Sequence, residues 1–352
     1  MGASKPRFGA NLDPRRGCGE RALSTDRRAA GSCGGRVRHD DGMRTPPPLP
    51  RPLVGVPFTL SQAQRHGVDA LRLRAGDIHH PFHGVNLSYG PGELQELCRA
   101  YLRVMPMHAF FSHTTAAELL GIPLPADAPR RPLHVSVLSP RTAPHGRGVT
   151  GHSLREIEGM DVSGLPVSMP AHVWCQLSGM LGPSDLVAAG DHLVGARNRP
   201  PIVTIDQLAE TSARVRRTKG GKARAWALSR IRFGTDSRPE SLLRLFLEEL
   251  GITGLRVNEP VLVADGRVLH PDLALPDQRI AFEYDGDGHR VERRQWFLDI
   301  KRHDLLVAAG WRVLRVTADD LFADRAAFVQ RLQRFAPNLG IATPKTEIWR
   351  KS

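Results

Sequence analysis

The last third of the chain alternates between helical and strand-like hydrophobic patterns. Apolar residues recur at helical spacing over 242–250, and Ser237 suits the N-cap of that helix. Three strand-like segments follow and end near residues 263, 275 and 285. A helix over 295–310, a strand over 311–317 and a final helix over 318–335 complete the series. This order predicts a mostly antiparallel sheet that gains its last strand through a helical crossover.

The pattern upstream predicts two smaller units. Over 51–91, a short helix broken by Gly67, a second amphipathic stretch and a strand pair have the layout of a winged helix-turn-helix, although a helical cap on the next domain has the same pattern. Residues 92–198 combine helical and strand-like segments and predict a small α/β domain. Residues 199–235 read as a linker followed by a basic helix, with solvent exposure and phosphate contact as equal alternatives. The expected class of the whole chain is therefore mixed α/β (α+β), with a C-terminal domain over 236–336 and a tail over 337–352.

The amino-acid composition favours some classes of binding partner over others. The 352 residues carry a formal net charge of +13, which favours polyanions and, first among them, nucleic acid. No apolar run approaches the length of a membrane span, so no membrane association is expected. The four cysteines are scattered without a CxxC pair, which fits a reduced, cytoplasmic setting. Residues 1–50 predict a disordered basic and proline-rich tail, in which Met43 is a candidate for the true start.

Carboxylates gather where the third predicted strand of the C-terminal domain ends. Glu283 and Asp285 lie two residues apart and so share one face, and Asp272 on the preceding strand can reach Glu283 across the pair. Converging carboxylates repel one another unless a cation binds, and hard oxygen ligands favour Mg²⁺ or Mn²⁺. A polar surface turn is the plain alternative. The seven histidines of 92–198 follow no metal-ligand spacing and are expected to be surface or satisfied core residues. They are His108, His113, His134, His145, His152, His172 and His192.

The segments "PESLLRLFL", "HPDLALPDQRIAFEYDGDGH" and "DIKRHDLLVAAGWRVLRVT" resemble an uncharacterised domain family related to very-short-patch repair endonucleases, of the restriction-endonuclease-like PD-(D/E)xK fold. The resemblance implies catalytic roles for five residues and a metal held by Asp272 and Glu283. Those catalytic candidates are Glu240, Asp272, Glu283, Asp285 and His289. It also implies that Asp299 and Arg302 are structural or contact phosphate. Asp285 stands where the general motif has a lysine, which the very-short-patch relatives also lack.

Basic side chains supply the candidate contacts to nucleic acid. Lys301 and Arg302 lie beside the acidic segment and could replace the motif lysine, and four others lie in the basic run before the C-terminal domain. Those four are Arg216, Arg217, Lys219 and Lys222.

The segments "FTLSQAQRHGV" and "HTTAAELLGIPLP" are similar to winged-helix proteins of the AbiEi antitoxin type, which implies a DNA-binding head.

Two functions therefore remain open. One is a Mg²⁺-dependent DNA endonuclease of repair or phage defence, for which a double-strand cut would need a homodimer. The other is an antitoxin-like regulator whose last domain binds nucleic acid without cleaving it. An interaction scaffold in phage defence is a third and weaker option.

Overall fold

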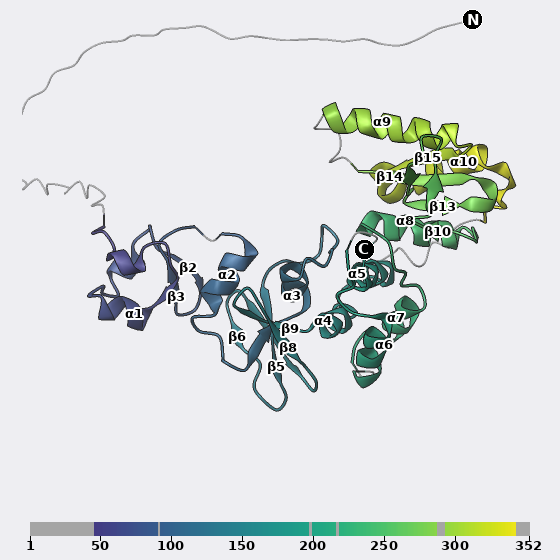
Figure 1. Ribbon diagram of the computed structural model, residues 1–352. Helices are drawn as coiled ribbons and strands as arrows, with labels where there is room; N and C mark the ends of the chain where they lie inside the picture. The colour runs from purple at the N-terminus through teal and green to yellow at the C-terminus, as the bar shows by residue number, and fades with distance from the viewer. Residues whose placement is uncertain (1–45, 91, 197–198, 216–217, 287–292, 343–352) are drawn as a thin grey trace, which may run out of the picture. The chain divides into compact units, whose positions relative to one another are not determined.

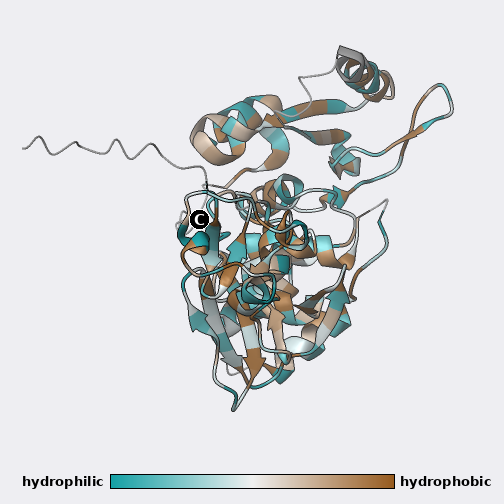
Figure 2. Cartoon of the chain, turned by 90° about the vertical axis from the view of Figure 1, so that its left-hand side faces the viewer, coloured by the Kyte–Doolittle hydropathy of each residue, from teal (hydrophilic) through white to brown (hydrophobic). Residues whose placement is uncertain are grey.

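Helices and strands alternate through the described chain, which confirms the predicted mixed α/β (α+β) class (Figure 1). The computed structural model describes residues 46–90, 92–196, 199–215, 218–286 and 293–342. Hydrophobic and hydrophilic residues alternate along these elements, as the brown and teal segments of Figure 2 show. Among the described helices, none is both long enough and apolar enough to traverse a bilayer. The predictions for residues 1–45, Arg216, Arg217, His289 and the final ten residues lie outside the described part of the chain.

The first described unit contains one helix and a three-stranded sheet in the order β1-β3-β2. Thr59 caps the helix, because its hydroxyl accepts from the Gln62 amide at 3.3 Å while the Gln62 side chain accepts from the Thr59 amide at 2.8 Å. The second amphipathic stretch forms only a 3-10 turn, Arg72–Arg74, where the sequence predicted a helix. The other elements are β1 (Phe58–Thr59), α1 (Leu60–Arg65), β2 (His79–Phe82) and β3 (Val85–Leu87).

The middle part is built on a six-stranded sheet in the order β6-β7-β5-β4-β9-β8. The strand-like segments that the sequence shows over 133–140, 148–154 and 164–170 form its β5, β7 and β9. The β4 and β6 strands, with three and two residues, are too short to show an alternating pattern of their own. The β8 strand has four residues, as β9 does, and the sequence did not predict it. The strands are β4 (Ala109–Phe111), β5 (Leu133–Leu138), β6 (His145–Gly146), β7 (Val149–Leu154), β8 (Gly159–Val162) and β9 (Leu165–Ser168).

Helices pack beside this sheet and share its hydrophobic core. In Figure 1, α6 and α7 lie next to α4 and α5, and Leu208 and Ala227 are buried in the same core as Trp174. Residues 199–235 are therefore not the linker that the sequence predicted, because their apolar side chains complete the middle domain. The helices are α2 (Leu94–Tyr101), α3 (His113–Leu119), α4 (Pro170–Leu177), α5 (Pro183–Val194), α6 (Ile205–Arg214) and α7 (Gly221–Leu228).

The C-terminal part carries a four-stranded sheet in the order β10-β13-β14-β15. Its β13 and β14 are antiparallel, and β15 pairs in parallel with β14 after the α9 crossover, as the sequence predicted. The first predicted strand, near residue 263, instead belongs to a separate hairpin, β11–β12, and the edge strand of the sheet is β10. The elements are α8 (Arg238–Glu249), β10 (Arg256–Val257), β11 (Val261–Leu262), β12 (Val268–Leu269), β13 (Leu273–Leu275), β14 (Ile280–Asp285), α9 (Arg293–Ala308) and β15 (Arg312–Thr317).

The final predicted helix is interrupted. A π-helical turn spans Asp319–Ala323, and α10 (Arg325–Phe335) begins only after it. The Asp324 carboxylate accepts from the Ala327 amide at 2.9 Å and so caps α10. An aspartate in this position satisfies an amide at the start of the helix, which explains why a new helix begins there.

Buried ion pairs join α5 to α8. Arg244 and Asp191 are each 1% exposed at the side chain and meet at 2.8 Å, and Arg238 contacts Asp185 at 2.6 Å. Burial raises the pKa of the Asp191 carboxyl, and Arg244 opposes that rise. Such pairs fix the register of two helices, because either charge alone would be costly to bury.

Candidate functional site in the C-terminal domain

Asp272 and Glu283 lie side by side at one end of the C-terminal sheet. Asp272 directly precedes β13, and the register pairs Leu273 with Phe282, so the next positions of the two strands are Asp272 and Glu283. The Tyr284 amide donates a hydrogen bond to Asp272 Oδ2 at 2.8 Å. Antiparallel pairing therefore brings together two acids that are eleven positions apart in the chain.

Both acids line a cleft of about 300 Å³. Asp236, Asp285 and Asp299 line it as well, so five carboxylates reach one hollow. The remaining lining residues are Asn258, His270, Tyr284, Arg302 and Arg315. The walls therefore combine oxygen ligands for a cation with two arginines that suit an anion.

The Asp272 carboxyl is the electrostatic centre of the cleft. Burial raises its pKa from the ordinary aspartate value of 3.8 to about 8, and the charges of Glu240 and Glu283 add to that rise. The Tyr284 amide and Arg302 lower the pKa, but their effect is smaller. A cation bound beside a carboxyl with a raised pKa would favour its ionised form, and this is the behaviour expected of a metal ligand.

Glu240 lies close enough to affect Asp272 but does not line the cleft. Its Oε2 accepts from the Asp236 amide at 2.9 Å, and its Oε1 accepts from the Ser237 hydroxyl at 2.7 Å. Burial raises its pKa, and the hydrogen bond from Ser237 opposes the rise. In this arrangement Glu240 holds the first turn of α8 together, and it acts on the cleft through its charge.

Two arginines partly neutralise the acids. Arg302 on α9 donates from Nε to Glu283 Oε1 at 2.9 Å, and its Nη2 donates to the His270 carbonyl. Arg315 on β15 stands in register with Glu283 and lies 3.9 Å from Asp285 Oδ2. The two arginines therefore supply positive charge beside Glu283 and Asp285, and Asp285 stands at the position where the resemblance leads us to expect a lysine.

Three of the predicted basic residues lie elsewhere. Lys301 is exposed, and its charge lowers the pKa of Asp265 on the β11–β12 hairpin rather than acting in the cleft. Lys219 and Lys222 are exposed beside α7 in the middle part. Among the described lysines and arginines predicted to bind nucleic acid, Arg302 is therefore the one that lines the cleft.

Sequence reasoning missed Arg315 and His270 as residues of the cleft. His270 Nδ1 lies 2.9 Å from the Asn258 carbonyl, and Arg315 sits on a strand whose position was predicted. A signal for Arg315 existed, because the predicted crossover places β15 beside the strand of Glu283. The register between the two strands was needed to pair the residues, and the sequence does not show it.

The donor set fits a hard divalent cation through two carboxylates. Glu283 lines the cleft and uses Oε1 for Arg302, so Oε2 is the oxygen that a cation would use. Within the described residues, the groups of three whose ligand atoms lie within 4.8 Å of one another are His113–His134–His152 and Glu156–Glu158–His172, and both are outside this cleft. A metal here would therefore rely on water and substrate oxygens to complete its coordination, as Mg²⁺ commonly does.

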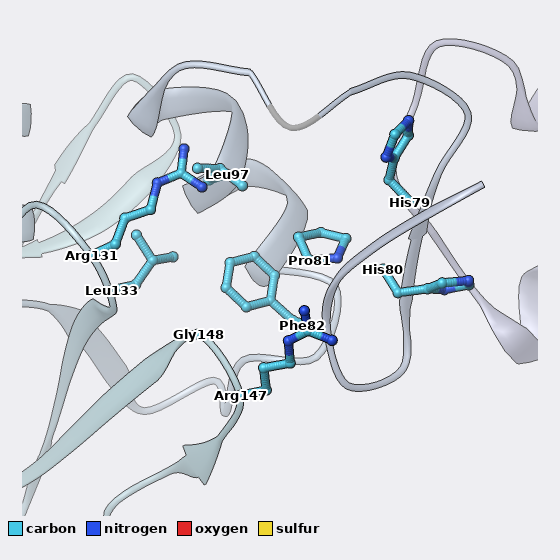
Figure 3. Close-up of a pocket in the computed structure, with 9 residues that line it drawn as sticks. All are labelled: His79, His80, Pro81, Phe82, Leu97, Arg131, Leu133, Arg147 and Gly148. Atoms are coloured by element: carbon cyan, nitrogen blue, oxygen red, sulfur yellow. The ribbon is translucent and has the colours of Figure 1, made fainter. Parts of the chain in front are cut away.

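A second hollow of about 330 Å³ lies beside β2. Figure 3 shows Arg131 and Arg147 on either side of Phe82, and both arginines are exposed. Positive charge beside an aromatic ring favours contact with a polyanion. The hollow contains no carboxylate among its lining residues, so it offers binding without metal chemistry.

No protein-family model matches the chain, and neither a curated protein nor a solved structure matches it. The functional argument therefore rests on the geometry of the cleft.

Proposed function

We propose that the C-terminal domain is a restriction-endonuclease-like, Mg²⁺- or Mn²⁺-dependent nuclease that hydrolyses phosphodiester bonds in DNA. The observation that supports this proposal is the shared cleft of Asp272 and Glu283, in which burial, together with the charges of Glu240 and Glu283, raises the pKa of Asp272 to about 8. A surface turn would leave these acids apart and solvated, whereas here they meet on neighbouring strands.

The proposed roles follow from the positions of the side chains. Asp272 and the second oxygen of Glu283 would hold the metal, which would lower the pKa of a bound water and stabilise charge on the phosphate. Arg302 and Arg315, which line the same cleft, contact the phosphate oxygens. Glu240 favours cation binding through its charge, and it makes no contact of its own with substrate.

Binding of DNA outside the cleft draws on the basic surface. The net charge of +13 and the arginines beside Phe82 support electrostatic binding to the phosphate backbone of DNA. The second predicted helix of the head is a single 3-10 turn, so among the described residues of that head the structure offers no long recognition helix. We therefore assign backbone contact, rather than base reading, to the N-terminal part.

One observation favours the alternative, an antitoxin-like regulator that binds DNA without cleaving it. Asp285 occupies the motif's lysine position, and Glu283 is tied to Arg302. If that ion pair persists when DNA binds, the metal lacks its second ligand. The two functions predict the same salt-sensitive binding and differ in cleavage.

Nicking of supercoiled plasmid in Mg²⁺ or Mn²⁺ separates the two functions. The proposal predicts that wild-type protein nicks the plasmid and that Asp272→Asn and Glu283→Gln do not. Asp277→Asn is the matched control, because Asp277 is an exposed acid on the turn that joins β13 to β14. Equal nicking by Asp272→Asn would remove the site assignment. Binding without nicking, together with promoter repression that survives deletion of residues 236–352, would favour the regulator.

A further inference from the structure

Three histidines of the middle part meet although they come from three different elements. His113 begins α3, His134 lies on β5 and His152 lies on β7, and one ring nitrogen from each lies within 4.8 Å of the others. The parallel register pairs Ser136 with His152, so His134 and His152 are diagonal neighbours on one face of the sheet. The fold therefore brings together residues whose spacing in the sequence follows no metal motif.

Close contacts define the geometry of the cluster. His134 Nδ1 lies 2.9 Å from His152 Nε2, and the ring of His113 stacks on that of His152 with centroids 3.8 Å apart. His113 has a positive φ of 52°, which is uncommon for a residue other than glycine. Its amide donates to Gln176 Oε1 at 2.9 Å, which holds this backbone in place. Residues with such uncommon backbone conformations are concentrated at functional sites.

Hydroxyl groups support His113 from behind. Its Nδ1 lies 3.0 Å from Ser112 Oγ, and the Ser136 hydroxyl donates to the same oxygen at 2.7 Å. When Ser112 accepts from Nδ1–H, the lone pair of the ring is on Nε2. Metal-binding histidines are commonly oriented by such a hydrogen bond on the other ring nitrogen.

We propose that His113, His134 and His152 bind one divalent transition-metal ion of the Zn²⁺ or Co²⁺ type, separate from the cleft of the C-terminal domain. Imidazole nitrogen suits these ions, whereas Mg²⁺ prefers oxygen. A Zn–N bond of about 2.0–2.1 Å in a tetrahedral site implies ligand nitrogens about 3.3 Å apart. The 2.9 Å separation of His134 and His152 needs to open by only a few tenths of an ångström.

The cluster is more accessible on one side than on the other. His113 and His134 are buried. His152 is only half-buried, which leaves a way in for the ion and a side for a fourth ligand.

The other convergent group lacks these properties. Glu156 and Glu158 lie beside His172, but Arg214 contacts them at 2.5 Å and 3.5 Å. A cation already occupies that position, so a metal would have to displace the guanidinium. In the histidine cluster, the ring hydrogen bonds join His113 to Ser112 and His134 to His152, so neither of these bonds involves a guanidinium.

The test is titration of untagged, full-length protein with Co²⁺, followed by visible absorption, and with Zn²⁺, followed by calorimetry. The proposal predicts one equivalent of either ion and the intense absorption of nitrogen-ligated Co²⁺. His152→Asn should weaken binding at least tenfold, whereas His145→Asn, which changes an exposed histidine on β6, should leave it unchanged. Asp272→Asn should also leave it unchanged, because its cleft is a different site.

Two results would overturn the proposal. One is wild-type protein that shows no Co²⁺ absorption beyond that of the hydrated ion, a result that needs no variant to fold. The other is His152→Asn that folds, as judged by circular dichroism, and binds Co²⁺ as tightly as wild type. Zn²⁺ that raises Tm in the wild type and not in His152→Asn would support the site independently.

Discussion

Replacing Asp272 with asparagine should make the protein more stable while removing its proposed activity. The carboxyl has a pKa of about 8 in the folded protein, whereas its ordinary pKa, which applies to the unfolded chain, is 3.8. Between those values the unfolded chain loses the proton and the folded chain keeps it. Stability therefore falls as the pH rises through this window and levels off above pH 8.

The size of the effect follows from the pKa change. A difference of this size corresponds to at most about 6 kcal/mol at pH 8.5, at 1.36 kcal/mol for each tenfold change. Part of this pKa change comes from the charges of Glu240 and Glu283, so the realised gain is smaller, about 1 to 6 kcal/mol. Asparagine keeps an oxygen that can accept from the Tyr284 amide, so the hydrogen bond survives.

Differential scanning calorimetry of full-length wild type and Asp272→Asn at pH 4, 6 and 8.5 measures this effect. We expect similar Tm values at pH 4 and a higher Tm for Asp272→Asn at pH 8.5, with Asp277→Asn matching wild type throughout. In the wild type alone, Mg²⁺ should raise Tm at pH 8.5. A Tm difference between wild type and Asp272→Asn that does not change with pH would refute the electrostatic account of the cleft.

Four further outcomes are expected. Arg302→Ala should reduce plasmid nicking at least tenfold, whereas Lys301→Ala, on the exposed side of the same helix, should change it less than twofold. Asp324→Ala should cost about 1 kcal/mol in urea unfolding, because α10 loses its cap. Arg244→Ala should cost about 3–5 kcal/mol in the same assay, because it leaves a buried carboxylate unpaired. Metal-free wild type should lose Tm as the pH falls from 7 to 5 and His113→Asn should lose less, since the folded pKa of His113, about 2, lies below its unfolded value and stability is present only above the latter.

Local sequence patterns predicted the helices and strands that are long enough for the spacing of their apolar residues to repeat. The spacing of apolar residues located α8 and α9, and Ser237 is the N-cap of α8. Alternation located β5, β7 and β15. It failed for β10, a strand of two residues, because so short a segment has no period to read. It located the segment that contains β11 but not the pairing of β11 with β12 in a separate hairpin.

The sequence by itself determined the mixed α/β class, the crossover to β15 and the proximity of Asp272, which directly precedes β13, to Glu283 on β14. Only the tertiary structure decided that Arg315 faces Glu283, that residues 199–235 complete the middle core and that three histidines converge. The physical reason is the range of the interactions. Helix periodicity and strand alternation act between near neighbours in the chain, whereas strand register and helix packing join segments that are far apart in it.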